Sequence, residues 1–301
     1  MYKLMLIPLA TIALSACSGS GGGSGDNAEP YDVSRNIDLQ SSTTPASTTN
    51  PGAVAQPASL LLEVTDALND YVDDLDELAA LTSGSCRGGG SVDVSTVTAG
   101  GTVTRTLRFD DCIDDDEYRD GVLELSCAAT GCAGDGSIRF GAAGAAYVEQ
   151  DLDGNGRQSE VLDGTIGFTA LSASRESGRL SFDLDAQFAD AAGVIGAARL
   201  DDLRMEMADS GATEETRYDG TLQFTAFRTP SGDCEASGTL SIATAAPLVY
   251  DDGRDRTESG QLRLGQISPG DVTWSAGSVT AAGGGTTASY SERDFDRLCD
   301  F

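Results

Sequence analysis

The segment "DLDGNGRQSE" at residues 151–160 has the residue types and spacing of a calcium-binding loop. Asp151, Asp153 and Asn155 stand at positions one, three and five of an EF-hand-like loop, where side-chain oxygens bind Ca²⁺. The next residue is a glycine, which permits the sharp turn at position six, and the Arg157 carbonyl would serve at position seven. The pattern predicts a weak Ca²⁺ site.

The end of this loop departs from the EF-hand pattern. Position twelve is Leu162 instead of a bidentate glutamate, so Glu160 or Asp163 would have to complete the site. A hairpin loop rich in Asp, Asn and Gly, between strands at 145–150 and 161–170, explains the same residues without a metal. The sequence leaves both interpretations open.

Other carboxylates give no specific signal. The clusters at 110–117 and 251–258 each follow an expected strand, where solvated turns are typical. Paired carboxylates could hydrolyse glycosides, but among 48 acidic residues such pairs arise by chance. Aromatic residues, which sugar sites use as platforms, make up 6% of the chain and are scattered.

The absence of histidine, and of lysine after Lys3, excludes several kinds of catalysis. The chain has no histidine, and its only lysine is Lys3, so an imidazole base and a lysine Schiff base are excluded from residues 17–301. A serine nucleophile would lack its usual bases. The net charge of −29 argues against binding nucleic acid or anionic headgroups by charge. We therefore expect a protein that is not an enzyme and has no nucleic-acid partner.

The first residues indicate export. Lys3 is followed by an apolar run of signal-peptide length, too short to span a bilayer comfortably, and then by small residues. Leu14-Ser15-Ala16-Cys17 resembles the lipobox of bacterial lipoproteins. The resemblance covers only these residues. It implies cleavage after residue 16 and lipidation of Cys17, and Ser18 in the next position implies an outer-membrane location.

Six cysteines remain when Cys17 is set aside, and an even set in an exported protein predicts disulfides. If 91–97 and 102–109 form a hairpin, opposed residue numbers add to about 199, which favours Cys86–Cys112. A four-residue turn separates Cys127 and Cys132, which leaves Cys234 with Cys299 at the C-terminus. A zinc site is the alternative, disfavoured by these spacings and by the lack of histidine.

Composition divides the chain into three parts. Residues 1–16 are the expected signal peptide, and residues 17–57, rich in Gly, Ser, Thr and Pro, are the expected lipid-attachment site and tether. Residues 58–301 are expected to form one β-rich domain, with a helix at 59–81 and strands from about residue 90.

The helix at 59–81 would begin at Ser59 as N-cap and stop near Gly84. Apolar residues recur at steps of three and four and form one stripe: Leu61, Val64, Leu68, Tyr71, Leu75 and Leu78. The opposite face is acidic: Glu63, Asp66, Asp70, Asp73, Asp74, Asp76 and Glu77. A membrane-surface helix would need Lys or Arg there, so we expect the stripe to pack on the sheet, with a coiled-coil partner as the alternative.

A short motif recurs from residue 120 onward. "DGTIGFTAL" at 163–171 matches "DGTLQFTAF" at 219–227, and shorter copies occur at 120–125, 177–182, 237–242 and 259–264. The Asp/Ser-Gly pair would supply a turn, and the following residues would alternate between a dry and a wet face, with Ile166, Phe168 and Ala170, and likewise Leu222, Phe224 and Ala226, on the dry one.

These patterns predict an antiparallel meander that forms a barrel or a strongly curved half-barrel with the helix on its concave or open side. A two-sheet sandwich is the alternative. The expected function is that of a lipid-anchored envelope lipoprotein with a binding, assembly or structural role and an envelope protein as partner. The alternatives are a periplasmic carrier of an apolar ligand and, less favoured, a carboxylate-dependent hydrolase.

Overall fold

The computed structural model describes residues 30–37, 39, 46–114, 117–152, 158–190, 193–228, 234–265 and 269–299. The N-terminal half of the sheet contains β1 (Gly84–Ser85), β2 (Gly89–Ala99), β3 (Thr102–Asp114), β4 (Glu117–Ala128), β5 (Gly131–Phe140), β6 (Tyr147–Asp151), β7 (Gln158–Leu171) and β8 (Gly178–Asp190). The C-terminal half contains β9 (Gly193–Asp209), β10 (Thr213–Arg228), β11 (Glu235–Asp251), β12 (Arg256–Leu264), β13 (Gly270–Ser275), β14 (Ser278–Gly283) and β15 (Thr286–Ser291).

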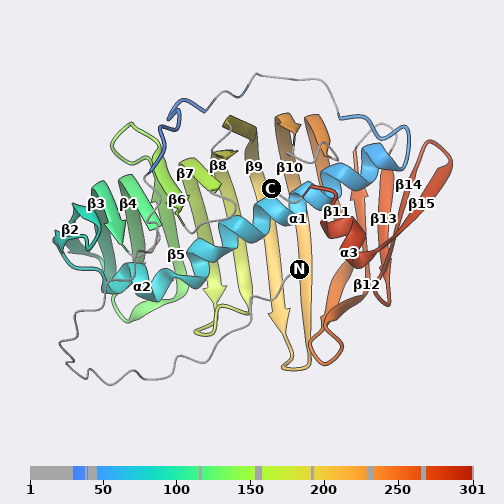
Figure 1. Ribbon diagram of the computed structural model, residues 1–301. Coiled ribbons are helices and arrows are strands. Elements are labelled where there is room, and N and C mark those ends of the chain that lie inside the picture. The colour runs from blue at the N-terminus through green and yellow to red at the C-terminus, as the bar shows by residue number, and fades with distance from the viewer. Residues whose placement is uncertain are drawn as a thin grey trace, which may run out of the picture.

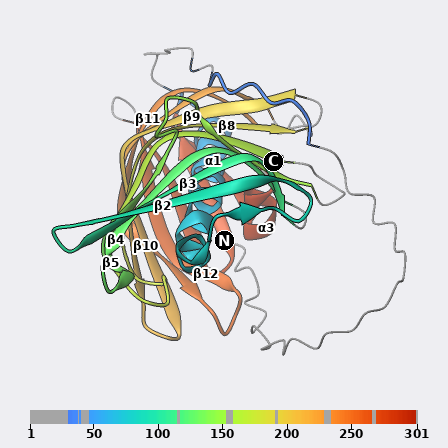
Figure 2. The ribbon, with the colours of Figure 1, turned by 90° about the vertical axis from the view of Figure 1, so that its left-hand side faces the viewer.

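All these strands belong to one antiparallel sheet whose neighbours follow the chain order, so the predicted meander is confirmed and the sandwich alternative is wrong. β6 pairs with β4 and β7, the same two strands that flank β5, and so closes a local ring. β5 and β6 thus act as one strand interrupted at 141–146. The sheet curls into a half-barrel around the long helix (Figures 1 and 2).

The helix on the concave face starts earlier than the sequence predicts. It comprises α1 (Gly52–Asp73) and, after a break at Asp74, α2 (Leu75–Ala80). Ser59 is buried inside α1 instead of capping it, and the Asn50 side chain accepts the Ala53 N–H at 3.0 Å. The first turns of α1 were assigned to the expected tether because of their Gly, Ala and Pro content. They are helical because Val54 packs against the β13–β14 end of the sheet, where Gly270 leaves room for it.

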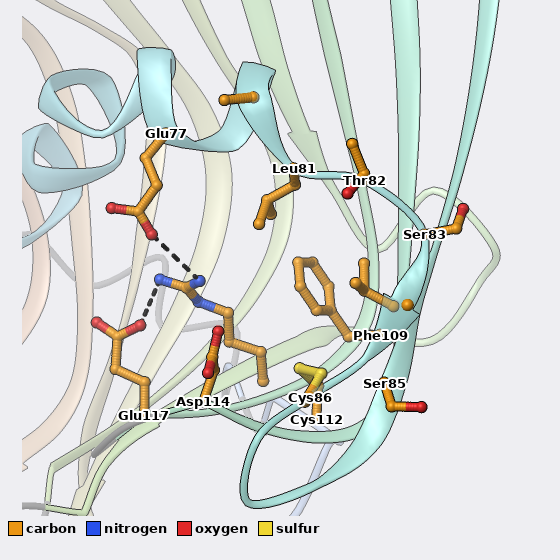
Figure 3. Close-up of a pocket in the computed structure, with 14 residues that line it drawn as sticks. Glu77, Leu81, Thr82, Ser83, Ser85, Cys86, Phe109, Cys112, Asp114 and Glu117 are labelled. Atoms are coloured by element: carbon orange, nitrogen blue, oxygen red, sulfur yellow. Dashed lines mark ion pairs between the residues drawn. A yellow bond between two sulfur atoms is a disulfide. The ribbon is translucent and has the colours of Figure 1, made fainter. Parts of the chain in front are cut away.

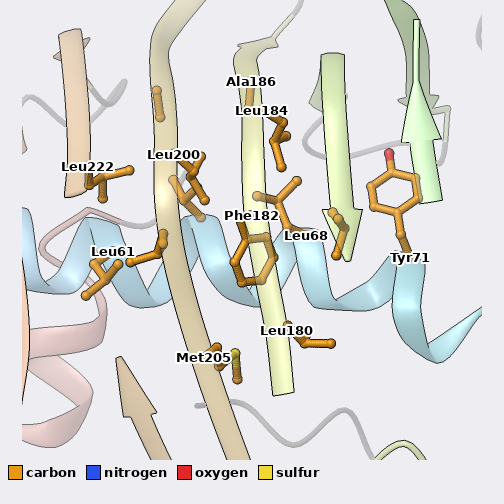
Figure 4. Close-up of a cluster of buried hydrophobic side chains, with 14 of the residues drawn as sticks. Leu61, Leu68, Tyr71, Leu180, Phe182, Leu184, Ala186, Leu200, Met205 and Leu222 are labelled. Carbon is orange, nitrogen blue, oxygen red and sulfur yellow. The ribbon is translucent and has the colours of Figure 1, made fainter. Parts of the chain in front are cut away.

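The predicted apolar stripe is confirmed, since all six of its residues are buried. In Figure 4, Leu61 and Leu68 project from α1 toward the inward side chains of β8, β9 and β10, whereas Tyr71 lies farther along the helix, with its ring against Phe140 of β5 and Tyr147 of β6. The facing side chains of β8, β9 and β10 are Leu180, Phe182, Leu184, Leu200, Met205 and Leu222. The acidic residues outside the stripe are exposed, except for half-buried Glu63, and two of them reach the sheet: Asp76 pairs with Arg175 after β7, and Glu77 pairs with Arg119 of β4. Burial of the stripe is what holds the helix, because its outer face repels itself electrostatically.

The Asp/Ser-Gly pairs at 120–121, 163–164, 219–220, 237–238 and 259–260 lie inside strands, so the turns predicted there are wrong, whereas Ser177-Gly178 lies where the β7–β8 turn enters β8, as predicted. Gly164 and Gly220 have φ of +138° and +140°, which residues with a side chain rarely adopt. A Cβ at Gly164 would lie 2.4 Å from the Asp183 carbonyl oxygen, and one at Gly220 would lie 2.5 Å from the Asp202 carbonyl oxygen. The motif therefore brings strands close together and curls the sheet.

The alternation of the repeat also slips at its end. Ile166 and Phe168 are buried as predicted, but Ala170 is exposed with φ +53°, and Leu171 takes the inward position. Leu222 and Phe224 are buried in the second copy, and Phe227 is the next inward residue. The β10–β11 register shifts between Phe224 and Phe227. The side chain of Ala226 lies outside the described ones. A one-residue bulge reverses the inward and outward sides of every later residue.

The convex face is charged. Arg199 of β9 lies opposite Asp185 of β8 with Nε 2.7 Å from Oδ1, and other arginines make similar cross-strand pairs with carboxylates. Such exposed pairs contribute about 0–1 kcal/mol each to the free energy of unfolding. Their main effect is to keep this face of the sheet hydrated.

Candidate functional site

The three predicted disulfides are present: Cys86–Cys112, Cys127–Cys132 and Cys234–Cys299. They tie the segment before β2 to β3, close the β4–β5 turn, and join the start of β11 to the chain end after the short helix α3 (Glu292–Asp296). Cys17 and the lipobox lie outside the described residues. Because the other six cysteines pair with each other, Cys17 is left out of the disulfide set.

The candidate calcium loop is described only at its two ends. Asp153, Asn155 and Arg157 lie outside the described residues, Asp151 ends β6, and β7 begins at Gln158. The flanking elements are strands, as the hairpin interpretation requires. Among the described residues, no group of three or more His, Cys, Asp or Glu side chains could hold a metal ion. Calcium binding stays a prediction.

The two candidates for position twelve lie on opposite faces of β7. Glu160 points to the concave side, where the Tyr71 hydroxyl of α1 donates to its Oε2 at 3.0 Å. Asp163 is exposed on the convex side, opposite Asp185 of β8. The two residues therefore cannot complete the same site, and a calcium ligand set would include at most one of them.

A small acidic hollow of about 120 Å³ surrounds Glu160, between the C-terminal end of α1 and the hairpin of β6 and β7. Its lining includes five carboxyl groups: Asp70, Asp74, Glu149, Asp151 and Glu160. Burial, reinforced by the nearby Glu149, raises the pKa of Glu160 to about 8. Burial thus favours the protonated form of Glu160, against the opposing effect of the hydrogen bond that the Tyr71 hydroxyl donates to it.

A second hollow of about 380 Å³ lies beside α2, above β2, β3 and β4 (Figure 3). One side is charged, with Glu77, Asp114 and Glu117, and the other is apolar, with Leu81 and Phe109, while the Cys86–Cys112 disulfide forms part of its wall. Its volume is within the usual range of small-molecule sites. Burial raises the pKa of Glu117 to about 7, against the opposing effect of Arg119.

Arg119 links the two hollows. Its guanidinium lies 2.5 Å from Glu117 Oε2, 3.9 Å from Glu77 Oε1 and 3.4 Å from Glu149 Oε2, and only 8% of the residue is exposed. Glu149 also accepts the Tyr147 hydroxyl at 2.6 Å. Three carboxylates thus surround one buried guanidinium, which is the arrangement of a structural ion-pair network, although the Arg119 Nε makes no hydrogen bond. The sequence gives no signal for Arg119, because its three partners come from α2, β4 and β6.

The titration of Glu160 should appear in the pH dependence of stability. Its folded pKa of about 8 exceeds the ordinary value of 4.5, so the folded state holds the proton more tightly. The contribution of this proton to the free energy of unfolding is fully present below about pH 4.5 and is lost as the pH rises to about 8. Between these values the free energy of unfolding falls by up to about 1.4 kcal/mol per pH unit. Glu160→Gln keeps an acceptor for Tyr71 and removes the titration, so we expect a flatter profile and greater stability than wild type above pH 8.

Urea unfolding between pH 5 and 9 measures this difference. Glu206→Gln, on the exposed convex face, is the matched control and should keep the wild-type slope. Equal slopes in wild type and Glu160→Gln would contradict the assignment.

The concave face is occupied by the protein's own helix. Leu61, Val64 and Leu68 have no exposed surface, and both hollows lie toward the α2 end of the groove. A carrier of an apolar ligand would therefore have to displace α1 from the half-barrel. No described helix is long and apolar enough to cross a membrane.

Comparison with known proteins gives no relative: no protein-family model, curated protein or solved structure matches this chain.

Proposed function

We propose that this protein is a lipid-anchored lipoprotein of the bacterial cell envelope, held at the outer membrane through Cys17, with a non-catalytic role in binding, assembly or envelope structure. The observation that carries the proposal is the cysteine pattern. Six cysteines form disulfides, which is typical of exported proteins, and the seventh follows Leu14-Ser15-Ala16. Its position supports modification by lipid instead of a fourth pairing.

The non-catalytic role is supported by the residues around the two hollows. Arg119 and its carboxylate partners are paired with one another, and no histidine or lysine stands in residues 17–301 to activate a nucleophile. With α1 filling the concave face, the convex face and the strand edges are the surfaces left for contact.

The outer edge of β2 supports a binding or assembly role. β1 pairs only with Ser91 and Val92, and the Ser83 hydroxyl bonds the backbone N–H and carbonyl of Val94. Among the described residues, no strand pairs with the outer side of 95–99. This edge is uncharged after Asp93, and Val97 is 64% exposed. Long uncharged edges with β-branched residues accept an added strand from a partner.

Cys17→Ser tests the anchor. We expect wild type to partition almost completely with membranes and into detergent, and the variant to lose nearly all of this association, because two or three acyl chains are needed for stable anchoring. Ser18→Ala keeps the cysteine and is the control, and it should remain bound. Crosslinking in intact cells would then identify the partner.

Tight membrane association of Cys17→Ser would contradict the lipid anchor. Disulfide mapping of the same variant checks that the three native pairs are unchanged, so that loss of membrane binding is not a folding defect.

A further inference from the structure

Residues 30–37, which we call the strap, lie on the convex face of the sheet. The sequence assigns them to a tether, yet they run across β6, β7 and β8 on the side opposite α1 (Figures 1 and 2). Their contacts are specific and come from both apolar and polar side chains. A segment that only connects two parts of a chain has no need for such contacts.

The surface under the strap is apolar, in contrast to the charged convex face around it. Val148 and Val161 are 3% and 0% exposed, and they form a small cluster on which Val33 and Ile37 of the strap pack. Their neighbours along β6 and β7, Tyr147 and Leu162, belong to the main core, so alternation places the two valines on the outer face. The strap, together with Tyr118 of β4, keeps them from water.

Two buried amides bind the backbone of the strap. The Gln150 side chain accepts the Tyr31 N–H at 3.3 Å and donates to the Tyr31 carbonyl at 2.8 Å. Gln187 donates to the Ser34 carbonyl at 3.1 Å, and both glutamines are 1% exposed. Buried amides need partners, and here the backbone of the strap supplies them from across the face of the sheet.

The side chains of the strap add further contacts. The Tyr31 hydroxyl donates to the Ala189 carbonyl at 3.3 Å and shares a hydrogen bond with Ser159. Arg35 pairs with Asp120 and donates to the Ala146 carbonyl at 3.4 Å. The strap is therefore held at both its ends.

We propose that this strap fixes the orientation and the reach of the body relative to the membrane. The inference rests on the proposed lipid anchor at Cys17. Fourteen peptide steps join Cys17 to Tyr31, which span at most about 50 Å, whereas 35 steps join Cys17 to Gly52 and span at most about 125 Å. Docking thus turns the outer side of β6–β8 toward the membrane. It also reduces the greatest distance between the body and the lipid anchor to less than half, from about 125 Å to about 50 Å.

The strap opposes a force that acts on the whole body. The chain carries a net charge of −29, which anionic headgroups repel, so an undocked body would stand farther from such a surface. The docked strap holds an acidic body closer to the membrane than its charge alone would allow.

Val33→Asp with Ile37→Asp tests the docking, because it places two carboxylates against the apolar cluster. Both substitutions lie in the strap, so the sequence of the body is unchanged. Ser34→Asp with Asn36→Asp adds the same charge at exposed strap positions and is the matched control. Arg35 is the first trypsin site after the leader and the only one before Arg87. Full-length protein is bound to vesicles, and the rate of cleavage after Arg35 is followed by mass spectrometry.

We expect the V33D/I37D variant to be cleaved at least about tenfold faster than wild type, since a docked segment is cut only when it opens, and the control to match wild type. Neutron reflectometry on supported bilayers should show the body of V33D/I37D farther from the membrane. Equal cleavage rates in all three proteins would overturn the docking. Faster cleavage with an unchanged distance would overturn the role in reach.

The same experiment separates failure of the strap from failure of the anchor. If the full-length protein does not bind vesicles before trypsin is added, the anchor is wrong and the proposed role in reach is overturned with it. Cleavage after Arg35 can then be measured in solution, where faster cutting of V33D/I37D supports docking and equal rates overturn it.

Discussion

Replacing Gly164 by alanine is expected to lower the free energy of unfolding by about 3 kcal/mol or more. Two costs add at this position. The φ of +138° is unfavourable for any residue with a side chain, and the new Cβ would meet the Asp183 carbonyl oxygen at 2.4 Å and the Leu184 Cα at 2.5 Å. Both neighbours are backbone atoms of β8, so relief requires that the strands separate.

Gly193 provides the matched control. Its φ is +139°, nearly the same, but nothing lies within 4 Å of the position its Cβ would take. Gly193→Ala should therefore cost only the backbone term, about 1–2 kcal/mol. Urea unfolding of both variants measures the difference. Equal losses would mean that the close approach of β7 and β8 contributes nothing to the curl of the sheet.

Removing the Cys234–Cys299 disulfide is the second change for which we expect a large effect. The bond spans 65 residues, and the chain-entropy relation gives a loss of about 4 kcal/mol for such a loop. The bond also secures α3, a five-residue helix too short to be stable alone, whose Phe295 packs edge-on against Trp274 at 5.5 Å.

The Cys127–Cys132 disulfide is the comparison. Its separation is only 5 residues, so replacing both cysteines by alanine should cost about 2 kcal/mol. The alanine pairs at the two disulfides are compared by urea unfolding. A smaller loss at 234/299 than at 127/132 would contradict the account, because it would mean that the C-terminal end folds independently of this bond.

Local patterns predicted the elements whose partners are nearby in the sequence. The stripe from Leu61 to Leu78 is readable because one helix face must be buried, whatever covers it. The Cys86–Cys112 pair was predicted from a hairpin register in which residue numbers add to about 199; the observed sum is 201, as in Ser95 opposite Thr106. Cys86 lies before β2 and outside this register, in the turn between β1 and β2, so the pairing was right although the register was not exact.

The errors arose where distant contacts override local preference. Gly164 and Gly220 were assigned to turns because Asp-Gly is typical of turns. In the structure, the missing side chain of each glycine allows the neighbouring strand to approach closely. The start of α1 was assigned to the tether because its packing against β13 and β14 involves residues more than 200 positions away. No local pattern contains that information.

The candidate site was predictable only in part. Glu160 was singled out as a calcium ligand, yet in the structure it binds the hydroxyl of Tyr71, which the sequence identified only as a core residue. Arg119 and Gln150 gave no signal, because their roles depend on neighbours from other strands and from the strap. Single residues of these networks were visible in the sequence, but their association was not.

The central claim is that Cys17 carries lipid. The most direct test is mass spectrometry of the N-terminal tryptic peptide of the mature protein, which ends at Arg35. The account predicts a peptide that begins at Cys17 and carries a diacylglyceryl group on its sulfur and an acyl chain on its α-amine. A mature chain that begins at another residue, or one whose Cys17 is unmodified, would contradict it.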